Sequence, residues 1–217
     1  MDRTLVLTIA GFLAVAIVVI VAARVQGKRE TAARNRFIAS HGWEELREPP
    51  ADLLAALELF APVRYQVTTK VASMERGPRR AWFFGYDVQT SARDRGTTGY
   101  ACLVEHDGPR PDTPIEVTRR VPLIERITPD KLDVGSPEFR EGWLVLGEQP
   151  GAAAQLVNAE VQRLMVAHDA GPAWKLDVDF VGPWVLVGSH WAAGPEEWEH
   201  LVRLARALAD AVGPEHR

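Results

Sequence analysis

The hydrophobic and polar positions divide the chain into one continuous apolar run and a remainder in which apolar residues recur periodically. The run extends from Thr4 to Ala23, twenty residues without a charge. A helix rises about 1.5 Å per residue, so this run would span about 30 Å, the thickness of the hydrocarbon core of a bilayer. The pattern predicts an N-terminal transmembrane anchor over residues 1–23. A cleaved signal peptide is the alternative, because Val21-Ala22-Ala23 is an acceptable cleavage site.

The charges that flank the apolar run predict its orientation. Arg3 is the one base before it, whereas five bases follow within a short distance: Arg24, Lys28, Arg29, Arg34 and Arg36. Positively charged flanks stay on the cytoplasmic side of a membrane. We therefore expect a single-pass protein of the cell membrane with its C-terminal domain in the cytoplasm. Residues 24–48 have good helix formers and are predicted to form a basic juxtamembrane helix.

Residues 49–217 form the predicted soluble domain, and their pattern changes from a helical to a two-residue period. A Leu-rich segment at 51–60 is typical of a short helix. Apolar and polar residues then alternate at 65–71, large apolar residues line one face at 82–88, an apolar run begins the segment 100–105, and a short fourth strand is expected at 115–117. This spacing predicts four strands in an antiparallel meander.

The last third of the domain combines helices with one more pair of strands. One helical stripe covers residues 151–167, and an alternating segment from 174 to 180 returns through Gly182-Pro183 to a second apolar run at 184–187. Pro195 opens a final amphipathic helix. The predicted fold class is α+β, with an antiparallel or mixed sheet and helices packed on it, preceded by one N-terminal transmembrane helix.

One motif of this last third is Ser136-Pro137-Glu138-Phe139, followed by the strand Trp143 to Leu146, by the helix and by the hairpin up to Ser189. In this layout, residues 136–190 resemble the C-terminal half of a family of uncharacterised membrane-anchored bacterial proteins, found widely in actinobacteria. Members usually carry Asn where this chain has Arg140. The resemblance implies a membrane-anchored protein with this fold organisation, and it transfers no catalytic residue.

The charge balance and the cysteine content exclude several classes of function. Residues 48–217 carry 18 bases and 25 acids, a net charge of −7. A domain without a basic field lacks the electrostatic footprint of a nucleic-acid-binding protein, so no nucleic acid partner is expected. Cys102 is the sole cysteine. It excludes an intrachain disulfide and a cysteine-cluster metal site, and its apolar neighbours predict a buried residue.

Motifs that carry chemistry are absent from the sequence. No phosphate-binding glycine loop, no GxSxG and no HExxH occurs. We therefore expect no cofactor, no metal and no catalytic residue that the sequence alone identifies. The alternative is a membrane-tethered hydrolase whose site assembles only in three dimensions from Ser189, His190 and either Asp177 or Asp179. Asp177 and Asp179 are also typical of the solvated face of a strand.

Two surface features are candidates for binding. Trp191 lies in a predicted loop, where an exposed indole suits a partner or a membrane interface. Arg76, Arg79 and Arg80 form a local basic cluster beside a predicted turn, which suits an acidic partner or a lipid headgroup. The sequence predicts a membrane-anchored binding or scaffolding module more readily than an enzyme. Its membrane contact would be made by Thr4 to Ala23, and a protein partner is not identified.

Overall fold

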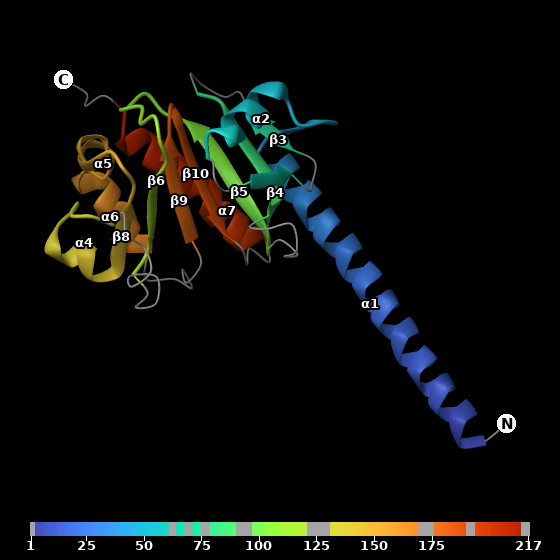
Figure 1. The fold of residues 1–217 in the computed structure, drawn as a ribbon. Helices are drawn as coiled ribbons and strands as arrows, with labels where there is room; N and C mark the ends of the chain where they lie inside the picture. Colours follow the sequence, from blue (N-terminus) through green and yellow to red (C-terminus); the bar gives the residue numbers. More distant parts are fainter. Residues whose placement is uncertain are drawn as a thin grey trace. The chain divides into compact units, whose positions relative to one another are not determined.

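The computed structural model describes residues 3–60, 64–67, 71–74, 79–89, 97–120, 131–168, 176–189 and 194–213. Contacts divide the chain into two units, Met1–Gly42 and Trp43–Arg217. The first unit contains α1 (Arg3–Ser40). The helices of the second unit are α2 (Ala51–Glu58), α4 (Pro137–Gly142), α5 (Pro150–Leu156), α6 (Ala159–His168) and α7 (Pro195–Ala211). Its strands are β1 (Glu44–Glu45), β2 (Arg64–Val67), β3 (Ala72–Met74), β4 (Ala81–Gln89), β5 (Thr97–Glu105), β6 (Ile115–Arg119), β7 (Lys131–Leu132), β8 (Trp143–Leu146), β9 (Leu176–Val181) and β10 (Trp184–Ser189) (Figure 1).

The first unit is one continuous helix. α1 has 38 residues, and it includes both the predicted anchor and most of the predicted juxtamembrane segment. Side chains in this helix are described from residue 16 onward, residue 23 excepted, and Ile17 to Val21 are between 53% and 66% exposed. Within the described residues, no helix combines the length and the apolar character that crossing a bilayer requires. The anchor at residues 4–23 therefore stays a prediction from the sequence.

The second unit is built on one antiparallel sheet. In the described part of the chain, ten strands form this sheet in the order β1-β3-β4-β5-β10-β9-β6-β8-β7, with β2 also paired to β4. Every described pairing is antiparallel. The sheet and its helices confirm the α+β class, and they decide between the antiparallel and mixed alternatives in favour of the former.

The strand order corrects the predicted meander. β4 and β5 are neighbours, as their spacing predicts, but β5 pairs next with β10, and β6 pairs with β9 and β8. The β9–β10 hairpin turns through Gly182 and Pro183, where Gly182 has a positive φ of 52°. This hairpin lies between β5 and β6, two strands that are close in sequence. A hydrophobic period shows that a segment is a strand, but it carries no information on the partner.

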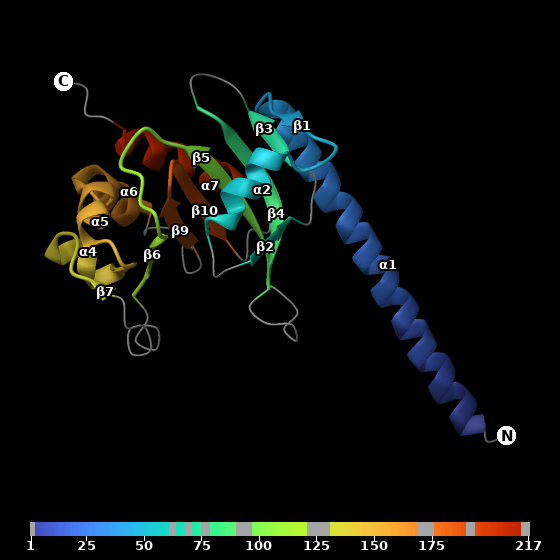
Figure 2. The same ribbon diagram turned by 45° about the horizontal axis from the view of Figure 1, so that its top comes forward.

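Helices cover both faces of the sheet. α7 lies against β5 and β10, where the Trp198 ring packs at 4.9 Å from Tyr100 and 6.1 Å from Phe83, centroid to centroid. α2 lies on the opposite face, and Figure 2 shows the two helices on either side of the strands. Its Leu53 and Leu57 belong to a core cluster with Trp82, Trp184 and Leu186. The pleat therefore directs alternate residues of each strand to two separate apolar layers.

Two helices differ from the sequence prediction. The expected helix at 151–167 is interrupted at Val157 and Asn158 and forms α5 and α6. The Asn158 side chain explains the interruption, because its Oδ1 accepts hydrogen bonds from the backbone N–H groups of Glu160 and Val161, both at 3.0 Å. α4 lies in a segment whose Gly and Pro residues favour a loop. Ser136 caps its N-terminus, because the Ser136 hydroxyl accepts a hydrogen bond from the Phe139 N–H at 3.2 Å.

Candidate functional site

The strand register separates the serine and the aspartates of the hydrolase alternative. Ser189 is opposite Leu176 and Tyr100, on the face that α7 covers. Asp177 is opposite Gly188, so Asp177 and Asp179 lie on the other face of the sheet. His190 lies outside the described residues. Ser189 and the two aspartates therefore lie on opposite faces of the sheet. Because His190 is not described, the hydrolase site stays an untested prediction.

The two aspartates belong instead to a half-buried acidic group. Glu116 of β6 is opposite Asp179 of β9, and the Tyr86 ring reaches the same face of the sheet. Burial, and then Asp177, raise the pKa of Glu116, while burial followed by Asp177 and Asp179 raises the pKa of Tyr86. Gly188 leaves room for this ring, since a Cβ there would lie 2.8 Å from the Tyr86 hydroxyl. The face of β9 that carries Asp177 and Asp179 is therefore less solvated than its alternating sequence predicts.

Metal binding has no candidate in the described part of the chain. Within it, no group of three or more His, Cys, Asp or Glu side chains is placed to hold a metal ion. Cys102 is fully buried, as its neighbours predict, and burial raises the pKa of its thiol to about 12. A thiol with that pKa stays protonated near neutral pH, so it is a poor nucleophile.

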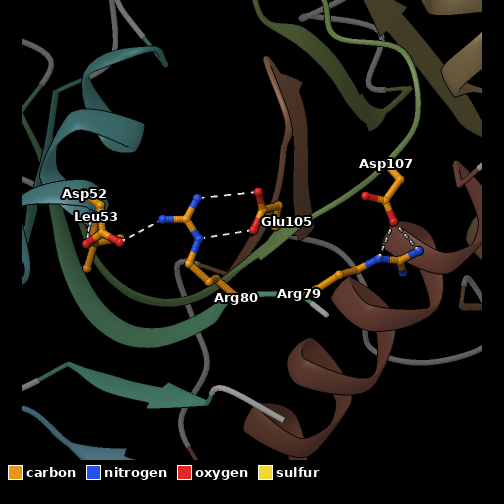
Figure 3. Close-up of polar contacts among 6 residues, drawn as sticks. All are labelled: Asp52, Leu53, Arg79, Arg80, Glu105 and Asp107. Atoms are coloured by element: carbon orange, nitrogen blue, oxygen red, sulfur yellow. Dashed lines mark hydrogen bonds and ion pairs between the residues drawn. The ribbon is translucent and has the colours of Figure 1, made fainter. Parts of the chain in front are cut away.

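The predicted basic cluster is neutralised by acids within the domain. Arg80 donates to Asp52 of α2 at 3.0 Å and to Glu105 of β5 at 3.1 Å, as Figure 3 shows. Arg79 pairs with Asp107 at 3.1 Å and also with Asp210 of α7. Arg76 lies outside the described residues. Arg79 and Arg80 therefore hold α2 and α7 to the strand ends, which leaves them little charge for an external acidic partner.

Arg80 also stacks on the aromatic layer beneath α2. Its guanidinium carbon lies 5.1 Å from the Trp184 ring centroid and 5.8 Å from that of Trp82. The two indole rings are 5.0 Å apart. The tryptophans at 82, 143, 184 and 198 are buried. Trp174 and the candidate contact residue Trp191 lie outside the described residues.

A histidine pair joins the end of α6 to α7. The rings of His168 and His200 have centroids 4.0 Å apart, and His200 Nε2 contacts His168 Nδ1. Arg203 Nη2 lies 3.1 Å from His200 Nδ1. Burial, His200, Arg119 and Arg203, in that order, lower the pKa of His168 to about 4, and burial and Arg203 lower that of His200. The sequence shows these histidines as unrelated, because they are separated by 32 positions.

A third histidine, His106, is buried directly after the end of β5. His106 is fully buried, and its Nδ1 accepts a hydrogen bond from the Gly108 N–H at 3.2 Å. Burial, followed by the charges of Arg110 and Arg79, lowers its pKa to about 4. These contacts suit a neutral imidazole that shapes the loop after β5.

A pocket with polar and apolar walls lies at the β7 edge of the sheet. It has a volume of about 470 Å³ and is formed by α4, β7, β8 and the residue after β6. Arg120, Lys131 and Arg140 contribute positive charges, and Asp133 and Glu141 contribute negative charges. The apolar wall includes Leu132, Val134 and Pro137. This volume is within the range of small-molecule sites, so the pocket is a candidate binding site among the described residues.

The walls of the pocket are fixed by local geometry. Gly135 has a positive φ of 100°, and a Cβ at this position would lie 2.5 Å from the Phe139 ring. The Ser136 N–H donates to Gln162 Oε1 of α6 at 2.8 Å. Phe139 is fully buried and packs nearly parallel to Trp143, with ring centroids 6.4 Å apart. In the sequence, the one signal of this site is the Gly-Ser-Pro turn that precedes α4, and a turn alone does not predict a pocket.

Comparison with known proteins relates the chain through its fold. No family model matches the chain, and no curated protein matches its sequence. A crystal structure of the mycobacterial trehalose monomycolate transport factor A, TtfA, is similar at a TM-score of 0.55 and 14% identity. The match covers 84% of this chain and 95% of that chain. The two proteins therefore share a fold over most of their lengths.

Proposed function

We propose that this protein is a membrane-anchored accessory factor of a transport process, and that its α+β domain acts as a cytoplasmic binding or scaffolding module. The observation that carries the proposal is the similarity to a transport factor over 84% of the chain. That neighbour is a factor for trehalose monomycolate. The proposal extends its general role to this chain and leaves the transported compound open.

The anchor in this proposal rests on the sequence. Residues 4–23 carry no charge, and five bases follow them before residue 37. The helical backbone of α1 runs without interruption through this segment and beyond. The apolar side chains of Ile17 to Val21 are exposed, which suits contact with lipid. The proposed topology has one span, with residues 24–217 on the cytoplasmic side.

The binding role is supported by how the polar groups of the domain are used. Arg79, Arg80 and their acidic partners stabilise the fold, and the register keeps Ser189 away from Asp177 and Asp179. The pocket beside α4 combines charged and apolar walls, which suits recognition of a ligand or a peptide. A scaffold that positions a partner near the membrane needs these features and no catalytic group.

A topology assay tests the anchor. Paired reporters, one active only in the cytoplasm and one only outside, are fused after Arg217, and the mass of the N-terminal peptide is measured. We expect a cytoplasmic signal, an uncleaved N-terminus and loss of membrane association when residues 4–23 are deleted. An external signal, or cleavage after Ala23, would contradict the proposed topology.

A genetic assay tests the role in transport. The gene is deleted in its source bacterium, and the distribution of glycolipids between the cytoplasmic membrane and the outer envelope is measured. We expect glycolipid to accumulate in the cytoplasmic membrane, with rescue by the full chain and not by the chain without residues 4–23. An unchanged distribution in the deletion strain would reject a role in glycolipid transport and leave the anchor untouched.

A further inference from the structure

We propose that the pocket formed by α4, β7 and β8 binds an oxyanion, the phosphate group of either a lipid headgroup or a free phosphate compound. The inference goes beyond the proposed function, and it depends on neither the anchor nor the transport role. It rests on the charges of the pocket, on its unused hydrogen-bond donors and on its fixed walls.

The charge of the pocket differs in sign from that of the domain. Three bases and two acids line it, whereas residues 48–217 carry a net charge of −7. The Lys131 side chain is exposed at the edge of the sheet, and Arg140 pairs with Asp133. A local excess of positive charge in a negative domain concentrates anions at this place.

Two buried hydrogen-bond donors of residues that line the pocket have no acceptor among the described residues. Arg140 Nε and Trp143 Nε1 are buried, and within the described residues neither has a hydrogen-bond partner. A buried N–H group without an acceptor costs free energy, which an acceptor brought by a ligand would recover. Oxyanions offer several acceptor oxygens at once and form charge-assisted bonds with guanidinium and ammonium groups. The donor surplus therefore selects an anionic ligand over a cationic one.

Asp133 forms an ion pair with the Arg140 guanidinium. Its carboxylate contacts Arg140 Nη1, although the Asp133 side chain is 84% exposed. An exposed carboxylate pairs weakly, because water solvates it well and screens the pair. We infer that Asp133 competes with the ligand oxyanion for Arg140, so removal of its charge strengthens binding. A pocket whose charges served only to stabilise the fold would show no such gain.

The apolar wall distinguishes the two sources of phosphate. Leu132, Val134 and Pro137 line the pocket beside the charged groups. A free phosphate compound uses the charged side only, whereas a lipid headgroup would also place its first methylene groups against this wall. Comparison of the two probes therefore identifies the source.

The test is a titration of the full chain in a neutral detergent, followed by calorimetry and by the indole N–H signals in ¹H–¹⁵N spectra. The probes are inorganic phosphate and dihexanoyl phosphatidylglycerol, and dihexanoyl phosphatidylcholine is the zwitterionic control. Trp143→Phe assigns the reporter signal in the pocket. We expect the Trp143 signal to move with at least one anionic probe, and the binding to weaken as salt is added. Tighter binding of the lipid probe would assign a headgroup, and equal binding would assign free phosphate.

Three variants locate the site. Lys131→Gln removes an exposed charge without breaking a described contact, and it should weaken binding about 3- to 10-fold. Asp133→Asn should tighten binding about 2- to 5-fold. Arg110→Gln, the matched control, removes an exposed base outside the pocket and should leave the affinity unchanged. The proposal is overturned if no probe moves the Trp143 signal, if Arg110→Gln weakens binding as much as Lys131→Gln, or if Asp133→Asn fails to tighten it.

Discussion

At the scale of single residues, three histidines of the domain lie in poorly solvated places beside arginines. His168 and His200 meet in a partly buried contact with Arg203 nearby, and His106 is enclosed beside Arg79 and Arg110. Each imidazole is held neutral because a proton would be added in a poorly solvated place next to a guanidinium. These contacts could not be predicted from the sequence, since their members come from distant segments and carry no shared motif.

The neutral histidines predict a loss of stability in mild acid. The pKa values of His106 and His168 are lowered from 6.5 to about 4, so the unfolded chain binds more protons than the folded one between these values. Their stabilising effect is fully present above pH 6.5 and is lost as the pH falls toward 4. Allowing for solvent screening, we expect the free energy of unfolding to fall by on the order of 1 kcal/mol per histidine.

Urea unfolding at a series of pH values measures this dependence. His168→Gln should make the free energy of unfolding depend less steeply on pH between 6.5 and 4, because the unfolded chain then has one fewer imidazole to protonate. A control, His41→Gln, changes a histidine of the first unit and should leave the slope of the second unit unchanged. A stability that is constant or that rises toward acid would show that these imidazoles are not held neutral.

Arg80 predicts a second effect at this scale. Arg80→Ala removes two ion pairs and the stacking of the guanidinium on Trp82 and Trp184. The ion pairs are half exposed, so we expect a loss of about 1 kcal/mol, much of it from packing. Arg80→Met keeps an apolar stem over the indole rings and should lose less. The midpoint of urea unfolding compares the two variants, and an equal loss would assign the effect to charge alone.

At the scale of elements, periodicity predicted most strands and the final helix. The segments at 82–88, 100–105 and 184–187 are strands because their alternate apolar residues face two buried layers. The break between α5 and α6 was missed, since the apolar stripe continues across it and the capping role of Asn158 depends on geometry. The candidate pocket was missed because its charged residues come from three elements whose pairing the sequence does not reveal.

Asn158 offers a direct test of the helix break. Its Oδ1 caps α6, and its Nδ2 donates to the Ala211 carbonyl at the end of α7 at 2.8 Å. Asn158→Ala should lower the free energy of unfolding by about 1 to 2 kcal/mol, because it removes the cap and leaves that carbonyl without this donor. Asn158→Ser retains a capping oxygen, so its free energy of unfolding should lie between that of the unchanged protein and that of Asn158→Ala. Denaturant titration followed by circular dichroism measures the series.

At the scale of the whole second unit, one sheet carries two apolar layers. Trp82 and Trp184 lie on the α2 face, and Trp198 packs on the α7 face. Because both layers share the same strands, neither can melt while the other keeps its packing. The unit is therefore expected to unfold as a single cooperative structure.

Coincident unfolding curves check this cooperativity. Tryptophan fluorescence, which reports both layers, and far-ultraviolet circular dichroism, which reports the backbone, should give one midpoint in urea. Leu53→Ala leaves a cavity in the α2 layer and should lower the free energy of unfolding by about 2 to 4 kcal/mol. Both unfolding curves should then move together to lower urea concentration. Separate midpoints for the two signals would show that the layers unfold independently.

The position of the β9–β10 hairpin has a consequence for synthesis on the ribosome. Strands β5 and β6 leave the ribosome well before residues 176–189. In the folded sheet, however, the hairpin of β9 and β10 lies between them and pairs with one edge of each. Until then the nascent chain presents two half-sheets with open edges, which are templates for association with other chains. A chaperone that shields these edges, or tethering that keeps nascent copies apart, would therefore matter more for this fold than for one whose neighbouring strands are consecutive.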